Sequence, residues 1–145
     1  MKMISTENIQ EEILVEFFEG KWEEMPDKTM LRQHGYLVEY QEQYKAYFAL
    51  APVKGDAFWL KSLYIKEGVP SSLPLSLIES AIAITRDKVV NGLFVYSHQQ
   101  TLSSLLTLLG FKEQLSPAFA DGLELKGGKW YKIEVNKVPQ LKSDL

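Results

Sequence analysis

The sequence lacks several residue types and motifs on which common functional classes depend. It contains no cysteine, so it cannot form disulfides, thiolate metal ligands or a cysteine nucleophile. Its two histidines, His34 and His98, lie far apart and without the spacing of metal ligands, so we expect no metal site. It has no Gly-x-Ser-x-Gly elbow, no Gly-x-x-x-x-Gly-Lys phosphate loop and no Gly-x-Gly-x-x-Gly. The hydrolase, P-loop and Rossmann classes therefore lose their main support.

Long apolar runs and an excess of positive charge are absent too. No stretch approaches the roughly 18 apolar residues of a membrane span, and the first residues contain no apolar segment of a signal peptide. Sixteen basic against 19 acidic side chains give a net charge of −3, which disfavours binding to the phosphates of nucleic acid. We therefore expect a cytoplasmic protein that binds neither membrane nor nucleic acid.

The composition is that of a protein with a core of its own. The chain has 145 residues, of which 46% are hydrophobic, and this predicts one domain over residues 1–138 and a loose tail over 139–145. Residues 7–24 carry seven glutamates but one lysine, and apolar residues recur there at helical spacing, at Ile9, Ile13, Leu14, Phe17 and Phe18. This pattern predicts an amphipathic helix with a solvated acidic face, and a site for a cationic substrate is the alternative.

The middle of the chain predicts strands around a helix. Three aromatic and β-branched runs predict an antiparallel meander over 36–40, 44–50 and 58–65. An apolar stripe over 71–88 predicts a helix that begins at Ser71–Leu73, because Pro74 is tolerated only in a first helical turn. The apolar run over 93–96 predicts a buried strand, so strand, helix and strand form a parallel crossover.

The last third of the chain carries signals for helix ends and turns. Ser97 to Gln100 fit a capping box, so a second helix is expected to begin at Ser97. Gly110 is expected in a left-handed conformation just beyond the end of this helix. Gly127-Gly128, between the runs 123–126 and 129–135, predicts a two-residue hairpin turn.

These elements define the expected fold class. It is a mixed α/β domain with a central, mostly antiparallel sheet, one parallel splay between the strands Phe58–Ile65 and Leu93–Tyr96, and flanking helices. Ligands commonly bind at the carboxyl ends of neighbouring parallel strands. Functional residues are therefore expected in the segments that follow these two strands.

Two short motifs stand out along this framework. Leu63-Tyr64-Ile65 is followed by a loop and a helix, and Leu105–Phe111 ends in Leu-Gly-Phe. Together with the order of elements, over roughly Gly35 to Val135, they resemble the GNAT family of N-acetyltransferases, in which Leu-Tyr-Val precedes a pyrophosphate-binding loop. The resemblance implies a GNAT-like fold, transfer of an acyl group from acetyl-CoA or another acyl-CoA, and a small-molecule or peptide amine as acceptor.

The resemblance also implies a coenzyme A site at the strand end and at the starts of the two helices. Backbone amides of the strand end would hold the pantetheine and polarise the acyl carbonyl. The family's Gln/Arg-x-x-Gly-x-Gly/Ala loop is replaced here by Gly68–Leu75, without the paired glycines, and its two serines either bind phosphate or only cap the helix. The implied cofactor-binding residues are Leu63, Tyr64, Ile65, Ser71, Ser72, Leu73, Leu75 and Gln99.

A general acid is harder to assign. Many family members carry a tyrosine that protonates the leaving thiolate, and the corresponding position here is Leu106, which cannot donate a proton. The remaining catalytic candidates are Tyr96, Tyr131 and Glu67, each with an alternative role in packing or in a solvated loop. Three interpretations stay open: an N-acyltransferase, a non-catalytic GNAT-like domain that binds coenzyme A, another ligand or a protein partner, and an unrelated α/β interaction domain.

Overall fold

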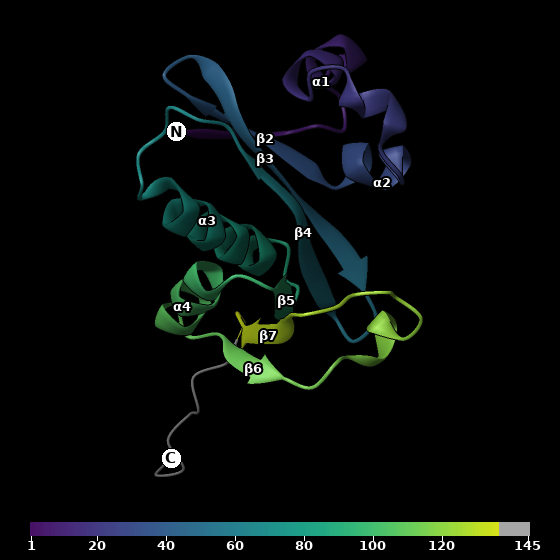
Figure 1. Ribbon diagram of the computed structural model, residues 1–145, viewed down its shortest axis with the longest axis vertical. Helices are drawn as coiled ribbons and strands as arrows, with labels where there is room; N and C mark the ends of the chain where they lie inside the picture. Colours follow the sequence, from purple (N-terminus) through teal and green to yellow (C-terminus); the bar gives the residue numbers. More distant parts are fainter. Residues whose placement is uncertain (137–145) are drawn as a thin grey trace. The chain divides into compact units, whose positions relative to one another are not determined.

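The computed structural model describes residues 1–136, and α1 to α4 and β2 to β7 are labelled in Figure 1. The tail expected over 139–145 lies outside the described residues. The chain divides into two compact units, one formed by Met1–Ala51 with Lys61–Leu73 and the other by Pro52–Leu60 with the chain from Pro74 onward. The single domain expected over 1–138 stays a prediction.

The strands form one sheet of mixed direction. Within residues 1–136 it has seven strands in the order β1-β2-β3-β4-β5-β7-β6, with β4 and β5 parallel. The strands are β1 Lys2–Ser5, β2 Gly35–Tyr40, β3 Gln43–Val53, β4 Ala57–Ile65, β5 Gly92–Ser97, β6 Lys112–Gln114 and β7 Lys129–Glu134. The helices are α1 Glu11–Phe17, α2 Lys28–Gln33, α3 Leu73–Asp87 and α4 Gln100–Leu108, with short 3₁₀ turns η1 Lys21–Glu24 and η2 Ala118–Ala120. The expected fold class, a mostly antiparallel sheet with one parallel pair and flanking helices, is confirmed.

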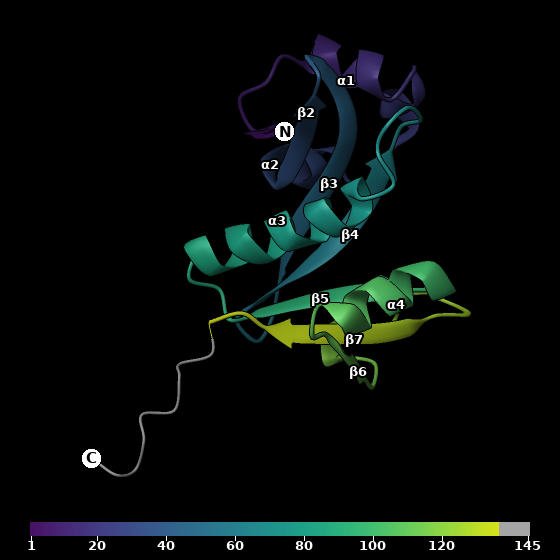
Figure 2. The same ribbon diagram turned by 90° about the vertical axis from the view of Figure 1, so that its left-hand side faces the viewer.

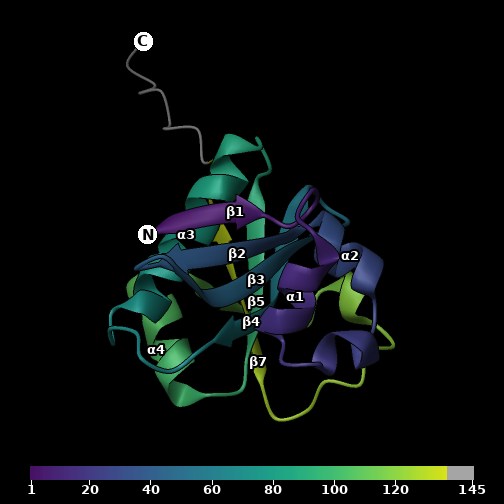
Figure 3. The ribbon, with the colours of Figure 1, turned by 90° about the horizontal axis from the view of Figure 1, so that it is seen from above.

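The first unit is built on β1, β2 and β3. Both strand pairs are antiparallel, and the β2–β3 register shifts between Val38 and Glu39. Figure 3 shows α1 and α2 beside these strands. Their apolar side chains share one core with the sheet, made of Leu14, Phe17, Phe18, Trp22, Leu31, Leu37, Tyr47 and Ala49. The aromatic and β-branched runs therefore formed strands as their propensities predict.

The amphipathic helix expected over 7–24 is wrong in its length. α1 ends at Phe17, and the chain turns through Glu19 and Gly20, both with positive φ, before η1. The turn brings Trp22 into the core, where its indole N–H donates to the Glu11 carboxylate at 3.3 Å. The apolar face is real, but two short helical segments present it instead of one long helix.

The second unit contains the parallel pair. The start of β4 pairs with β5 from Ala57↔Gly92 to Leu60↔Val95, and β5 pairs antiparallel with β7. Helix α4 lies against β5, as Figure 2 shows. The crossover and its helix α3 begin and end close to their predicted positions.

The hairpin expected at Gly127-Gly128 is wrong. Residues 123–126 form no strand, and β7 instead pairs with β6, from Lys112↔Lys132 to Gln114↔Trp130. A Cβ atom on Gly128 would lie 2.7 Å from the Ser97 carbonyl oxygen and 2.5 Å from the Tyr96 ring. This glycine therefore serves a close approach of backbone to β5 rather than a hairpin turn.

The capping box expected at Ser97 is also wrong, because Ser97 is the last residue of β5 and pairs with Lys129. Helix α4 begins at Gln100 with Gln99 as its N-cap, and no side chain caps it. The Ser97 hydroxyl instead donates to the Gln99 carbonyl at 3.0 Å. At the other end the prediction is confirmed: Gly110 has φ 97°, and its N–H donates to the Thr107 carbonyl at 3.1 Å.

Candidate functional site

The second half of β4 carries a backbone irregularity that no local sequence pattern predicts. Ser62 has φ 58°, a left-handed conformation that is uncommon for a residue with a side chain. Such a residue inside a strand redirects the backbone and the side chains that follow, and non-glycine residues in this conformation cluster at functional sites. The next residues are Leu63, which is half-buried, and the exposed Tyr64 and Ile65. Two large apolar side chains thus face solvent at the strand end.

Aromatic contacts within the first unit hold Tyr64. Its ring packs edge-on against Phe18, with centroids 5.3 Å apart, and lies 6.3 Å from Tyr47. The Tyr47 hydroxyl donates to the Leu31 carbonyl at 2.6 Å. Burial raises the pKa of Tyr47 well above its usual range, and the nearby Tyr64 raises this pKa further. Tyr47 is therefore a neutral structural group beneath an exposed Tyr64.

The loop between β4 and α3 begins against β3. The Lys66 N–H donates to the Lys45 carbonyl at 2.8 Å, and the Lys45 ammonium lies 3.4 Å from the Glu67 carbonyl oxygen. Glu67 itself is exposed. Gly68 follows with φ 83°. The catalytic candidate Glu67 therefore lies in a solvated loop.

At the start of α3 the two serines and the leucine differ in exposure. Ser71 and Ser72 are exposed, so their hydroxyls are accessible to a ligand. Leu73 is buried, and its N–H donates to the Pro70 carbonyl at 3.0 Å. The Leu73 amide is therefore engaged within the loop, which leaves the serines as the accessible groups here.

The remaining candidates lie in the second unit. Leu75 is half-buried in the first turn of α3, and Gln99 is exposed at the start of α4. Tyr131 on β7 is buried. Leu106 is completely buried, so the position at which the resemblance implies a tyrosine belongs to the core of this unit. The candidates are thus divided between the units, with Leu63–Leu73 in the first and the others in the second.

Tyr96 is the phenol in the second unit whose side chain is both partly exposed and fixed. Its oxygen accepts a hydrogen bond from the Gly128 N–H at 2.8 Å, and its ring lies 5.3 Å from that of Trp130. Because the oxygen is the acceptor in this bond, the hydroxyl hydrogen is left to be donated elsewhere. The geometry therefore suits a proton donor.

Residues 1–136 lack the features of a metal site and of a membrane-spanning helix. No group of three or more histidine or acidic side chains is arranged to hold a metal ion. No helix in the same range is long and apolar enough to cross a membrane.

Comparisons of the sequence with known proteins gave no match, whereas comparisons of the fold did. No protein-family model matches the chain. No curated protein matches it either. N-acetylglutamate synthase from Neisseria gonorrhoeae, solved with coenzyme A and N-acetyl-glutamate, superimposes with a TM-score of 0.69 and 11% identity over 94% of this chain. This chain spans only 35% of that synthase.

Two other solved proteins are similar over nearly their whole length. A GNAT-family acetyltransferase from Staphylococcus aureus Mu50 gives a TM-score of 0.67 at 13% identity, with 92% of this chain and 98% of that one covered. An aminoglycoside 6′-acetyltransferase of type Ii gives 0.68 at 14% identity, with 96% and 100% covered. The chain therefore has the fold of the GNAT acetyltransferases, as the sequence resemblance implies.

Proposed function

We propose that this protein is a cytoplasmic N-acyltransferase that uses acetyl-CoA or another acyl-CoA and a small-molecule or peptide amine. The observation that carries the proposal is the fold, which the chain shares over 92% and 96% of its length with two acetyltransferases. A third protein of this fold was solved with coenzyme A. In the reaction the amine nitrogen attacks the thioester carbonyl, a C–N bond forms and the C–S bond breaks. The amine loses a proton, and the leaving thiolate takes one up.

The end of β4 would hold the thioester. The left-handed Ser62 redirects the strand just before Leu63, and the exposed Tyr64 and Ile65 offer apolar contact to a pantetheine chain. Backbone amides of these residues would polarise the acyl carbonyl, since fixed amides stabilise the developing oxyanion. Proximity of thioester and amine supplies much of the remaining rate.

The start of α3 would hold the phosphates. The hydroxyls of Ser71 and Ser72 are exposed beside a helix N-terminus, where the helix dipole favours an anion. The Leu73 side chain is buried, so it leaves the solvent side of the loop open. Leu75 and Gln99 complete the proposed set of cofactor-binding residues.

Of the three catalytic candidates, we propose Tyr96 as the group that protonates the thiolate. Tyr131 is buried and Glu67 is a loop carboxylate, whereas the Tyr96 hydroxyl is partly exposed and fixed by the Gly128 N–H. Tyr96→Phe should therefore lower kcat by roughly 10²-fold, the lower end for general acid catalysis, with little change in KM for acyl-CoA. An unchanged kcat in a thiol-release assay would exclude this role.

A second function is favoured by one observation. Leu106 is completely buried where the resemblance implies a proton donor. A GNAT-like domain that binds coenzyme A or another ligand without catalysis would need no donor at that position. The two functions differ in turnover, so the thiol-release assay with a panel of amines separates them.

The phosphate site can be tested by calorimetry with acetyl-CoA on the folded protein. Replacing Ser71 and Ser72 together by alanine should weaken binding at least about tenfold, because each hydroxyl would donate a charge-assisted hydrogen bond of roughly 1.5–3 kcal/mol. If the serines only cap α3, the double variant loses about 1 kcal/mol of stability and keeps its affinity. Absence of binding by the unaltered protein would contradict the acyl-CoA proposal itself.

A further inference from the structure

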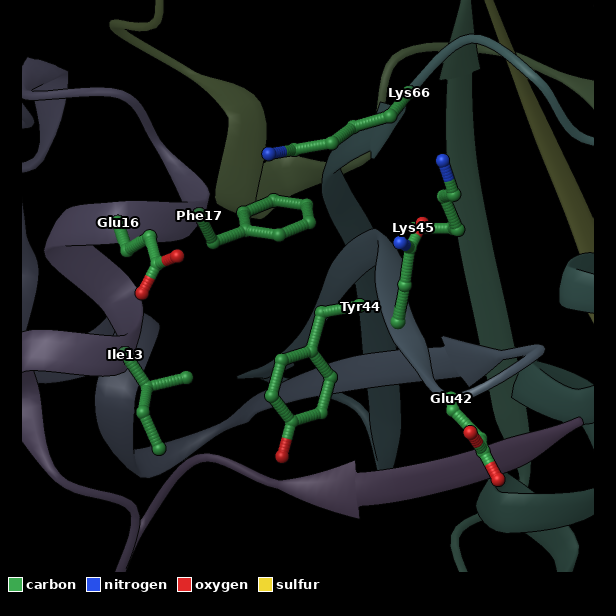
Figure 4. Close-up of a pocket in the computed structure, with 8 residues that line it drawn as sticks. Ile13, Glu16, Phe17, Glu42, Tyr44, Lys45 and Lys66 are labelled. Atoms are coloured by element: carbon green, nitrogen blue, oxygen red, sulfur yellow. The ribbon is translucent and has the colours of Figure 1, made fainter.

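A cavity of about 470 Å³ lies within the first unit (Figure 4). Its walls come from α1, from the start of β3 and from the residue after β4. This volume is in the range of about 300–1,000 Å³ that is typical of small-molecule sites. Among its lining residues are Glu16, Phe17, Glu42, Tyr44, Lys45 and Lys66.

The cavity holds charges of both signs that are not paired with one another. The Lys66 ammonium lies 4.5 Å from the centre of the Phe17 ring and 3.9 Å from the Glu19 carboxylate. The Lys45 ammonium contacts the backbone carbonyl of Glu67 at 3.4 Å. Within the described part of the chain, neither lysine forms an ion pair with Glu16 or Glu42. Both signs are therefore available to a ligand.

The charged groups are separated by aromatic rings. In Figure 4, Glu16 of α1 lies on one side, Lys45 of β3 lies on the opposite side, and the rings of Phe17 and Tyr44 lie between them. The Lys66 side chain reaches across the top of the cavity, and its ammonium lies above the Phe17 ring on the α1 side. Across the cavity, Glu16 is thus followed by the aromatic rings and then by Lys45, and Glu42 lies farther from the rings on the Lys45 side.

We propose that this cavity binds a small zwitterion with a flat apolar body and with an ammonium and a carboxylate at opposite ends. The ammonium contacts Glu16, the body packs against Tyr44 and the edge of Phe17, and the carboxylate contacts Lys45. Ionised hydrogen bonds fix the direction of the ligand, while the rings supply apolar contact. The site is separate from the proposed acyl transfer and does not depend on it.

The probe is 4-(aminomethyl)benzoate, which has the required charges at the two ends of one ring. Its halves serve as matched ligands: benzylamine lacks the carboxylate, and 4-methylbenzoate lacks the ammonium. Titration of the isotopically labelled protein, followed by amide shifts in NMR, should show saturable changes at α1 and at the start of β3. Each half-ligand should bind at least about threefold more weakly, the effect of losing one partly exposed charged contact.

Two variants and two controls complete the experiment. Glu16→Gln should weaken binding of the zwitterion and of benzylamine but leave the affinity for 4-methylbenzoate unchanged. Lys45→Gln should weaken binding of the zwitterion and of 4-methylbenzoate but leave the affinity for benzylamine unchanged. Glu12 on α1 and Lys21 on η1 lie outside the cavity, so the control variants Glu12→Gln and Lys21→Gln should leave all affinities unchanged. The proposal is overturned if the zwitterion causes no saturable shifts at millimolar concentration. It is equally overturned if all three ligands bind alike, or if the controls weaken binding as much as the cavity variants do.

Discussion

Gly35 is the residue of the first unit with the least room for a side chain. A Cβ atom there would collide with the Leu31 carbonyl oxygen and with the Tyr47 hydroxyl, and it would lie 2.6 Å from the Tyr47 ring. These two groups also form a hydrogen bond with each other, so neither can move away without losing it. Close packing of this kind makes even one methyl group costly.

We expect Gly35→Ala to lower the free energy of unfolding by about 3 kcal/mol, at the upper end of the cost of overpacking. Gly55→Ala is the matched control, because φ is 93° there but no atom lies within 4 Å of the added Cβ. The control should lose only about 1 kcal/mol, from backbone strain. Urea unfolding measures the free energy of both variants. Equal losses of stability would show that Leu31 and Tyr47 can move apart at little cost to make room for the added methyl group.

Tyr47 gives the protein a predictable weakness at high pH. Its pKa is raised in the folded state, first by burial and then by Tyr64, so the phenol stays protonated when the unfolded chain already ionises near pH 10. The stabilisation is therefore complete below about pH 10 and is lost as pH rises above it.

Above pH 10, ionisation of Tyr47 in the unfolded chain lowers the free energy of unfolding by about 1.4 kcal/mol per pH unit. Tyr47→Phe loses the hydrogen bond to Leu31 and is less stable at pH 8, but its stability should fall less steeply above pH 10. Urea midpoints at pH 8, 9, 10 and 11 measure the difference. Parallel curves for the two proteins would mean that Tyr47 ionises normally.

At the scale of single elements, the C-terminal end of α4 makes a sharp prediction. Gly110 has φ 97°, and the Phe111 N–H donates to the Leu106 carbonyl at 2.9 Å, which closes the last helical turn. An added Cβ would meet only Ile133, at 3.7 Å, so space is not the constraint.

Gly110→Val should therefore destabilise the protein by roughly 1–2 kcal/mol through backbone strain alone. Gly110→Asn is the control, since asparagine tolerates the left-handed region, and it should lose clearly less. Chemical denaturation compares the three proteins. A valine variant as stable as the asparagine variant would place the strain elsewhere.

Elements with strong local patterns could be predicted from the sequence, whereas elements without them could not. The strands β2, β3 and β4 and the helix α3 have long aromatic or apolar patterns, and they were predicted. The strand β1 has four residues and β6 has three exposed ones, too short for any alternation to show. These strands form only because a neighbour is available to pair with, which is information that a local window lacks.

The candidate site was predictable to a similar degree. The exposed residues at the end of β4 and the start of α3 follow from the motif and the helix signals. The left-handed conformation of Ser62 has no sequence signal, because serine does not require it. Gly128 has a sequence signal with two meanings, because glycine suits both a tight turn and a close approach of the backbone to another group. In the structure it allows the close approach to Tyr96.

At the scale of the whole molecule, ligand binding should raise stability by mass action. If acetyl-CoA binds only the folded chain, a concentration of about 100 times its Kd adds about 2.7 kcal/mol to the free energy of unfolding. A thermal shift with acetyl-CoA, compared with an equal concentration of ATP, measures this. No shift at millimolar acetyl-CoA, or an equal shift with ATP, would count against a specific acyl-CoA site.

The division into units also bears on how the chain is made. Each unit uses two separate stretches of sequence, and the three boundaries fall inside β3, inside β4 and in the first turn of α3 rather than in linkers. No single cut in the gene can therefore encode one unit without part of the other. During synthesis the ribosome must release residue 65 before the first unit has all its strands, and by then residues 52–60 of the second unit are already outside.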